Sequence, residues 1–138
     1  MSKNAKVGTA SKLEVLTSQL TVLGNKYIED KDYISAQLTF RKLLQLDSKD
    51  VNARFIYAHL IEDGTHKKLA EARDLLLSIL DDHPEILNNP TEDNLNLVRG
   101  AAMRCNYIGP NDRAIELLRK LARAPSRLSN QGFSGEFA

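Results

Sequence analysis

Residues 20–48 read LTVLGNKYIEDKDYISAQLTFRKLLQLDS and hold the most informative pattern in the chain. Apolar residues recur every three or four positions on both sides of the polar stretch Glu29–Asp32. That spacing predicts two amphipathic helices joined by a short turn. Because a short connection forces the second helix to lie antiparallel to the first, these residues predict a helical hairpin.

The same periodicity extends over most of the 138 residues. We expect six helices, over about residues 12–30, 32–46, 51–62, 67–82, 92–107 and 111–123, and no strand. The residues Glu85–Pro90 are expected to form a loop. Capping and breaking residues place the boundaries, namely Ser11 with Glu14, Gly64, Pro84, Thr91 and Asn111. The fold class is therefore expected to be all-α.

An internal repeat organises these helices. The even-numbered helices each carry an Ala followed four residues later by a large apolar residue, in the pairs Ala36/Phe40, Ala72/Leu76 and Ala114/Leu118. A breaking residue follows each pair, at Ser48, Pro84 and Ser126. The odd-numbered helices align on Leu23-Gly24, Tyr57-Ala58 and Ala101-Ala102. Self-similarity at a regular spacing is the sequence signature of stacked helical repeats, in which small residues let neighbouring backbones approach.

These residues resemble the tetratricopeptide repeat family, whose signature is an aromatic residue, Leu-Gly, Tyr, Ala with Phe four residues on, and Pro. The match is strongest over residues 12–48, weaker over 49–84 and weakest over 91–126. The positions that correspond to the family's structural signature are Leu20, Leu23, Gly24, Tyr27, Ala36, Phe40, Ala58, Ala72, Leu76, Pro84, Ala101, Ala102, Ala114 and Leu118. The resemblance implies a right-handed superhelical stack of three helical hairpins, an α-solenoid over residues 12–126, between flexible segments 1–11 and 127–138.

In that family the odd-numbered helices line a concave groove that binds a partner polypeptide. The resemblance places Thr21, Asn25, Ile28, Asn52, Phe55, Ile56, His59, Asn96, Arg99, Met103 and Asn106 in the groove. Asparagine amides pair with both the N–H and the C=O of an extended backbone, and Met103 adapts to irregular apolar partners. Phe55 and Ile56 are alternatively core residues. We therefore expect a protein-interaction scaffold or adaptor that holds a peptide or helix of its partner.

Two alternatives stay open. The chain is close in size to small three-repeat chaperones of bacterial secretion systems, which hold an export substrate, and Leu46–Asp50 is similar to a turn that some of them carry. The second alternative is self-assembly. No helix is expected after Arg123, so the last helix lacks a polar cap, and either Phe133 and Phe137 of the tail or a second copy would cover it. A homo-oligomer is therefore possible.

Charge and histidine placement argue against other functions. A net charge of +1 supplies no field to attract nucleic acid, and the basic residues near the sixth helix suit the negative end of its dipole, namely Arg113, Arg119, Lys120, Arg123 and Arg127. His59, His66 and His83 lie in different elements without the spacing of metal ligands. We expect no metal, no cofactor, no small-molecule substrate and no catalysis.

Cys105 is the one cysteine, so an internal disulfide is excluded. It stands where the repeat family places an aromatic residue, which predicts a buried, inert thiol. No apolar run approaches the roughly 18 residues of a membrane span, and the polar residues 1–10 do not resemble a secretory signal. These features predict a cytoplasmic protein.

Overall fold

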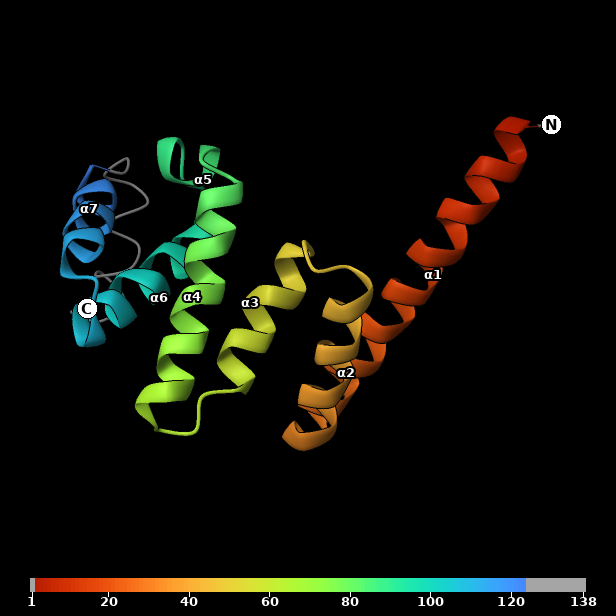
Figure 1. Cartoon of the computed structure of the whole chain (residues 1–138), viewed down its shortest axis with the longest axis horizontal. Coiled ribbons are helices and arrows are strands. Elements are labelled where there is room, and N and C mark those ends of the chain that lie inside the picture. The colour runs from red at the N-terminus through yellow and green to blue at the C-terminus, as the bar shows by residue number, and fades with distance from the viewer. Residues whose placement is uncertain (1, 124–138) are drawn as a thin grey trace. The chain divides into compact units, whose positions relative to one another are not determined.

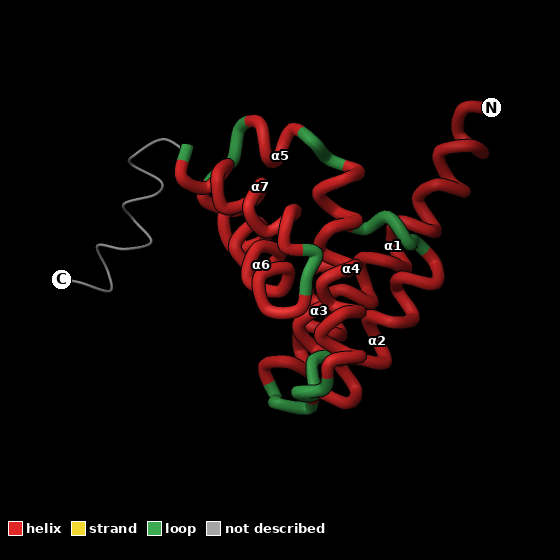
Figure 2. The backbone as a smooth tube through the Cα atoms, turned by 60° about the vertical axis from the view of Figure 1, so that its left-hand side comes forward, coloured by secondary structure: helices red, strands yellow, loops and turns green. Residues whose placement is uncertain are grey.

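The computed structural model describes residues 2–123, with side chains from Lys12 onward. Every element of this part is helical, and the helices are joined by loops and turns (Figures 1 and 2). They are α1 (Ser2–Glu29), α2 (Tyr33–Leu46), α3 (Val51–Leu60), α4 (His66–Asp82), α5 (Glu85–Asn88), α6 (Glu92–Ile108) and α7 (Asn111–Ala122). The predicted all-α class is confirmed for the described residues.

The chain divides into two compact units, residues 1–61 and 62–138, which are described separately. In the first unit, α2 packs on α1 and on α3. Its core consists of Phe40 and Leu43 of α2 and Ala53 of α3, all fully buried. Asp32 and Asp50 cap α2 and α3, because their carboxylates accept the backbone N–H of Ser35 at 3.1 Å and of Ala53 at 2.9 Å.

The hairpin of α1 and α2 depends on a glycine. A Cβ atom at Gly24 would lie 2.5 Å from Cε2 of Phe40, well inside van der Waals contact. Phe40 itself has no exposed surface. The large aromatic side chain therefore packs directly on the α1 backbone, in agreement with the expectation that small residues let neighbouring backbones approach.

In the second unit, α6 packs on both α4 and α7, and the short α5 contacts α7. Its core includes residues from all four helices, namely Ala72, Leu76, Ile79, Leu80, Ile86, Leu95, Val98, Ala101, Ala102, Cys105, Ala114 and Leu117. Two arginines tie the elements together at the edge of this core. Arg73 Nη1 donates to the Gly109 carbonyl at 2.8 Å, and Arg113 Nη2 donates to Asp81 Oδ1 at 3.0 Å.

Several expected boundaries are wrong. α1 begins at Ser2 rather than near Lys12, so Ser11 lies inside the helix and is not an N-cap. Residues 85–88, expected as loop, form α5. Pro110 rather than Asn111 is the N-cap of α7. Thr91 is the N-cap of α6 as predicted, although its side chain forms no capping bond. α3 ends at Leu60 with Ile61 as its C-cap, so Gly64, at a φ of +87°, lies in the following turn and does not close the helix as predicted.

The structural positions of the repeat pattern are mostly buried. The exceptions are Leu23, Pro84 and Leu118, which are exposed, and Leu20 and Tyr27, which are half-buried. In α7 the fully buried leucine is Leu117, because one residue along a helix turns the side chain by about 100° toward the core. The third predicted pair, Ala114 with Leu118, therefore does not bury its large member.

The boundary between the two units falls inside the predicted second repeat, residues 49–84. Its two helices, α3 and α4, belong to different units, so a stack of three hairpins stays a prediction. The tail residues Ser126, Arg127, Phe133 and Phe137 lie outside the described residues.

Candidate partner-binding surface

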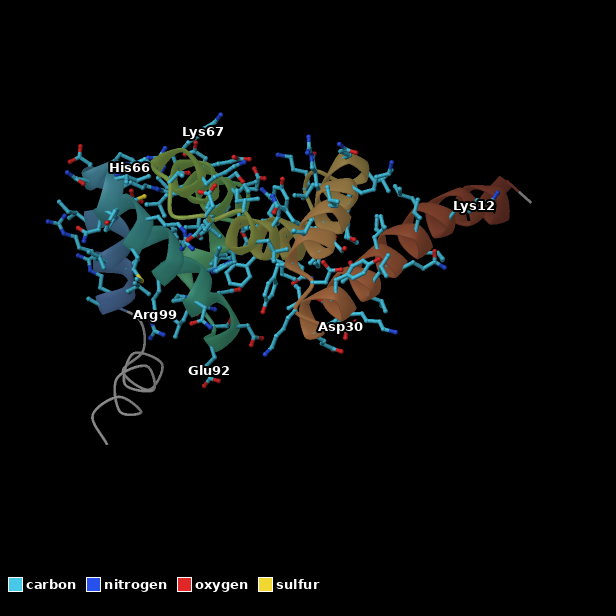
Figure 3. The ribbon with its side chains drawn as sticks, turned by 90° about the horizontal axis from the view of Figure 1, so that it is seen from below. Lys12, Asp30, His66, Lys67, Glu92 and Arg99 are labelled. Carbon is cyan, nitrogen blue, oxygen red and sulfur yellow. The ribbon has the colours of Figure 1, made fainter. Side chains whose placement is uncertain are left out.

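One face of α6 is accessible along most of its length. Asn96, Met103 and Asn106 are exposed, and Arg99 is half-buried, at intervals of three or four residues. In Figure 3, Arg99 and Glu92 project from the same side of this helix. The structure thus brings together the four predicted groove residues of the third repeat. Together with Tyr107, we call Asn96, Arg99, Met103 and Asn106 the α6 face.

A cavity of about 320 Å³ adjoins the α6 face at its C-terminal end. Its lining residues come from α4, from α6 and from the turn between α3 and α4, and they are Glu62, Gly64, Leu69, Met103, Arg104 and Tyr107. The side chains of Met103 and Tyr107 are 71% and 76% exposed, so large apolar groups border the opening. This volume is at the lower end of the range for ligand pockets.

Arg104 forms a wall of this cavity and does not offer a free charge. Its Nε donates to Glu62 Oε1 at 2.7 Å, and its Nη1 donates to the Gly100 carbonyl at 2.9 Å. Nη2 of Arg104 also donates to the Glu62 carboxylate. Because Arg104 and Glu62 bind each other, Arg99 is the cation of the α6 face.

The predicted groove residues of the first unit separate into two groups. Ile28 of α1 and Ile56 of α3 pack against the core, so Ile56 follows the core alternative. Thr21 is half-buried, and its hydroxyl donates to the Thr17 carbonyl at 2.9 Å within α1. These three side chains therefore take part in core packing or in hydrogen bonding within the first unit.

The remaining groove residues of this unit are accessible. Asn25 of α1 and Asn52 and His59 of α3 are exposed, and Phe55 is half-buried. The rings of Phe55 and His59 meet edge to face with centroids 4.7 Å apart. His59 Nδ1 also lies 2.8 Å from the Phe55 carbonyl. The two side chains therefore form an ordered aromatic surface on α3.

The sequence interpretation missed Tyr107 and Leu69. Tyr107 lies four residues after Met103 and one helical turn further along the same face, so the periodicity of α6 contained the signal. Leu69 belongs to the apolar periodicity of α4, and it is half-buried and lines the cavity. Neither the ring contact between His66 and Tyr107, with centroids 6.4 Å apart, nor the Glu62–Arg104 ion pair follows from sequence spacing.

Cys105 is buried, and His83 contacts a neighbouring carboxylate. Burial raises the pKa of the Cys105 thiol, against smaller opposing effects of Arg73 and Arg113, so the buried thiol matches its predicted environment. His83 Nδ1 lies 3.1 Å from Glu85 Oε1. Within residues 2–123, no group of three or more His, Cys, Asp or Glu side chains has a metal-binding arrangement. No helix in this range has the length and apolar character to cross a membrane.

Comparisons with protein-family models, with curated proteins and with solved structures each found no match to the chain.

Proposed function

We propose that the chain is a non-catalytic scaffold that binds a segment of a partner polypeptide. The observation that carries this proposal is the α6 face, where amide side chains, one cation and two exposed apolar side chains lie in a row beside a cavity. Exposed large apolar groups next to a recess are typical of protein-binding surfaces. The amides of Asn96 and Asn106 suit the backbone of an extended segment, and the cavity suits its apolar anchor.

We further propose that the chain is a tetratricopeptide-type stack of three helical hairpins and that it acts in the cytoplasm. Asn25, Asn52 and His59 would then extend the binding surface beyond α6. Their exposure in the first unit supports this extension. The repeat pattern of residues 20–48 and the packing of Phe40 on Gly24 support a tetratricopeptide-type first hairpin.

Affinity capture from an extract of the source cells tests this function. The variant carrying Asn96→Ala and Met103→Ser should lose specific proteins that the wild-type chain retains. A matched control carries Ile34→Ser and Leu38→Ser, because these α2 side chains are 76% and 60% exposed and lie outside the proposed surface. Capture of the same proteins by wild type and α6 variant would reject the α6 face as the binding site.

Self-assembly is a second candidate, and one observation favours it. Ile115 and Leu118 of α7 are each 48% exposed and lie three residues apart on one side of the helix. Such an apolar strip on the last described helix suits a second copy. Sedimentation velocity over a range of concentrations should then show association that Leu118→Ser removes, and a monomer at every concentration would reject this candidate.

A further inference from the structure

One side of α1 carries a continuous apolar strip. Five residues, spaced alternately three and four apart, form a seam along one side of the helix: Leu13, Leu16, Leu20, Leu23 and Tyr27. Leu20 packs against the core of the first unit. Leu13, Leu16 and Leu23 nevertheless remain 48%, 43% and 41% exposed. We call these five residues the leucine seam.

The N-terminal part of the leucine seam is uncovered because α1 is longer than its neighbour. α1 has 28 residues and α2 has 14, so their lengths are about 42 Å and about 21 Å. Since Gly24 faces Phe40 and the helices are antiparallel, α2 accompanies the C-terminal half of α1 (Figure 1). A helical segment of about 14 residues without tertiary packing is marginal in water. We therefore expect the apolar side of the N-terminal half of α1 to be covered by a binding partner.

The charges of α1 identify the kind of partner. Lys12, Gln19 and Lys26 recur every seven residues, each one position before a seam residue. They border the seam on the side away from α2. Thr17 and Gly24 each follow a seam residue by one position and border the seam on the side that faces α2. Lys12 and Lys26 are exposed, and the structure shows no ion pair for either with another described residue. Lys12 is labelled on α1 in Figure 3.

The acidic residues of α1 lie farther from the seam than the lysines, although Glu14 lines one hollow with Leu23 and Lys26. Glu14 and Glu29 point about 140–160° away from the middle of the seam, at 100° per residue. A second copy of α1 would therefore supply no carboxylate to this border. Antiparallel pairing centred on Gln19 would instead bring Lys12 of one copy beside Lys26 of the other, and like charges repel. Charge complementarity favours a partner with acidic residues.

We propose that the leucine seam of α1 is a docking surface for an acidic amphipathic helix of a partner protein. The apolar face of that helix covers Leu13, Leu16 and Leu23, and its carboxylates pair with Lys12 and Lys26. This mode of recognition lays one amphipathic helix along another. This surface is distinct from the α6 face, so a test that rejects one binding surface leaves the other unaffected.

Two synthetic probes test the proposal against the full chain. Both are peptides of about three heptads with leucine at the core positions, and they differ in carrying either glutamate or lysine at the flanking positions. Fluorescence anisotropy should show that the glutamate peptide binds at least about tenfold more tightly than the lysine peptide. Higher salt should weaken this preference, since the pairs are exposed.

Charge reversal provides the decisive variant. Lys12→Glu combined with Lys26→Glu should invert the preference, while Lys42→Glu on an exposed site of α2 should leave it unchanged. Leu16→Ser with Leu23→Ser should weaken binding of the glutamate peptide about tenfold or more, and Leu38→Ser is the matched control. Far-UV circular dichroism verifies that each variant is folded.

Three results would overturn the proposal. The first is the absence of binding by either peptide, and the second is equal binding of both to the wild-type chain. The third is self-association of the chain that Leu16→Ser with Leu23→Ser abolishes, because a second copy would then occupy the seam.

Discussion

Replacing Gly24 with alanine tests the packing on which the first hairpin depends. The added Cβ would lie 2.5 Å from Cε2 and 2.8 Å from Cζ of Phe40. Because Phe40 is fully buried, its ring has no solvent-filled space to enter. Overpacking of this kind costs about 1–3 kcal/mol, and the better helix propensity of alanine returns about 1 kcal/mol. We expect a net loss of up to about 2 kcal/mol in the free energy of unfolding.

Gly100→Ala is the matched control, since Gly100 is also inside a helix. A Cβ there would meet Nη1 of Arg104 at 3.0 Å and Cδ1 of Leu76 at 3.4 Å, which are milder contacts. Urea unfolding followed by circular dichroism should rank Gly24→Ala below Gly100→Ala in stability.

Phe40→Leu should remove most of the penalty at Gly24, which a double-mutant cycle measures. A Gly24→Ala chain more stable than the wild type by the full helix-propensity gain would refute the close contact between α1 and α2.

Three further predictions follow from particular side chains. Leu117→Ala should lower the free energy of unfolding by about 2–5 kcal/mol and Leu118→Ala by less than about 1 kcal/mol, and urea unfolding in which Leu118→Ala costs more would contradict the placement of α7. Cys105 should react slowly with a thiol reagent at neutral pH and quickly after urea unfolding, because it is buried and its pKa is raised; equal rates would show an accessible thiol. Hydrogen bonds from the Ser35 side chain and backbone lower the pKa of Asp32 below 3.8, so its contribution to stability is fully present above about pH 4 and is lost as the pH falls through the folded-state value. Asp32→Ala should therefore reduce the loss of stability between pH 5 and pH 2 in urea titrations, and an unchanged pH dependence would contradict this capping role.

Local sequence patterns predicted most of the helices. The N-cap position of Thr91 and the close approach of helices at Gly24 each follow from local chemistry and spacing. These signals act within a few residues along the chain or within one hairpin. The hairpin of α1 and α2 was accordingly predictable, including the residue that permits it.

Boundaries and long-range contacts were less predictable. The capping box at Ser11 competes with a helical periodicity that continues toward Ser2, and the local pattern did not decide between them. Leu117 and Leu118 are both apolar, so the choice of the buried one depends on where α6 lies. The Arg104–Glu62 pair joins residues 42 positions apart, and no local pattern encodes it. Four residues of the α6 face were predicted from the sequence. The adjoining cavity was not, because Leu69 of α4 forms part of its lining.

Site-specific photocrosslinking tests the central claim that the α6 face binds a partner polypeptide. A photoreactive amino acid replaces Met103, which is 71% exposed, and in a control chain it replaces Ile34, which is 76% exposed. We predict that irradiation in cell extract links position 103, and not position 34, to a defined segment of another protein. Crosslinking to other proteins from position 34 alone, or from neither position, would contradict the claim.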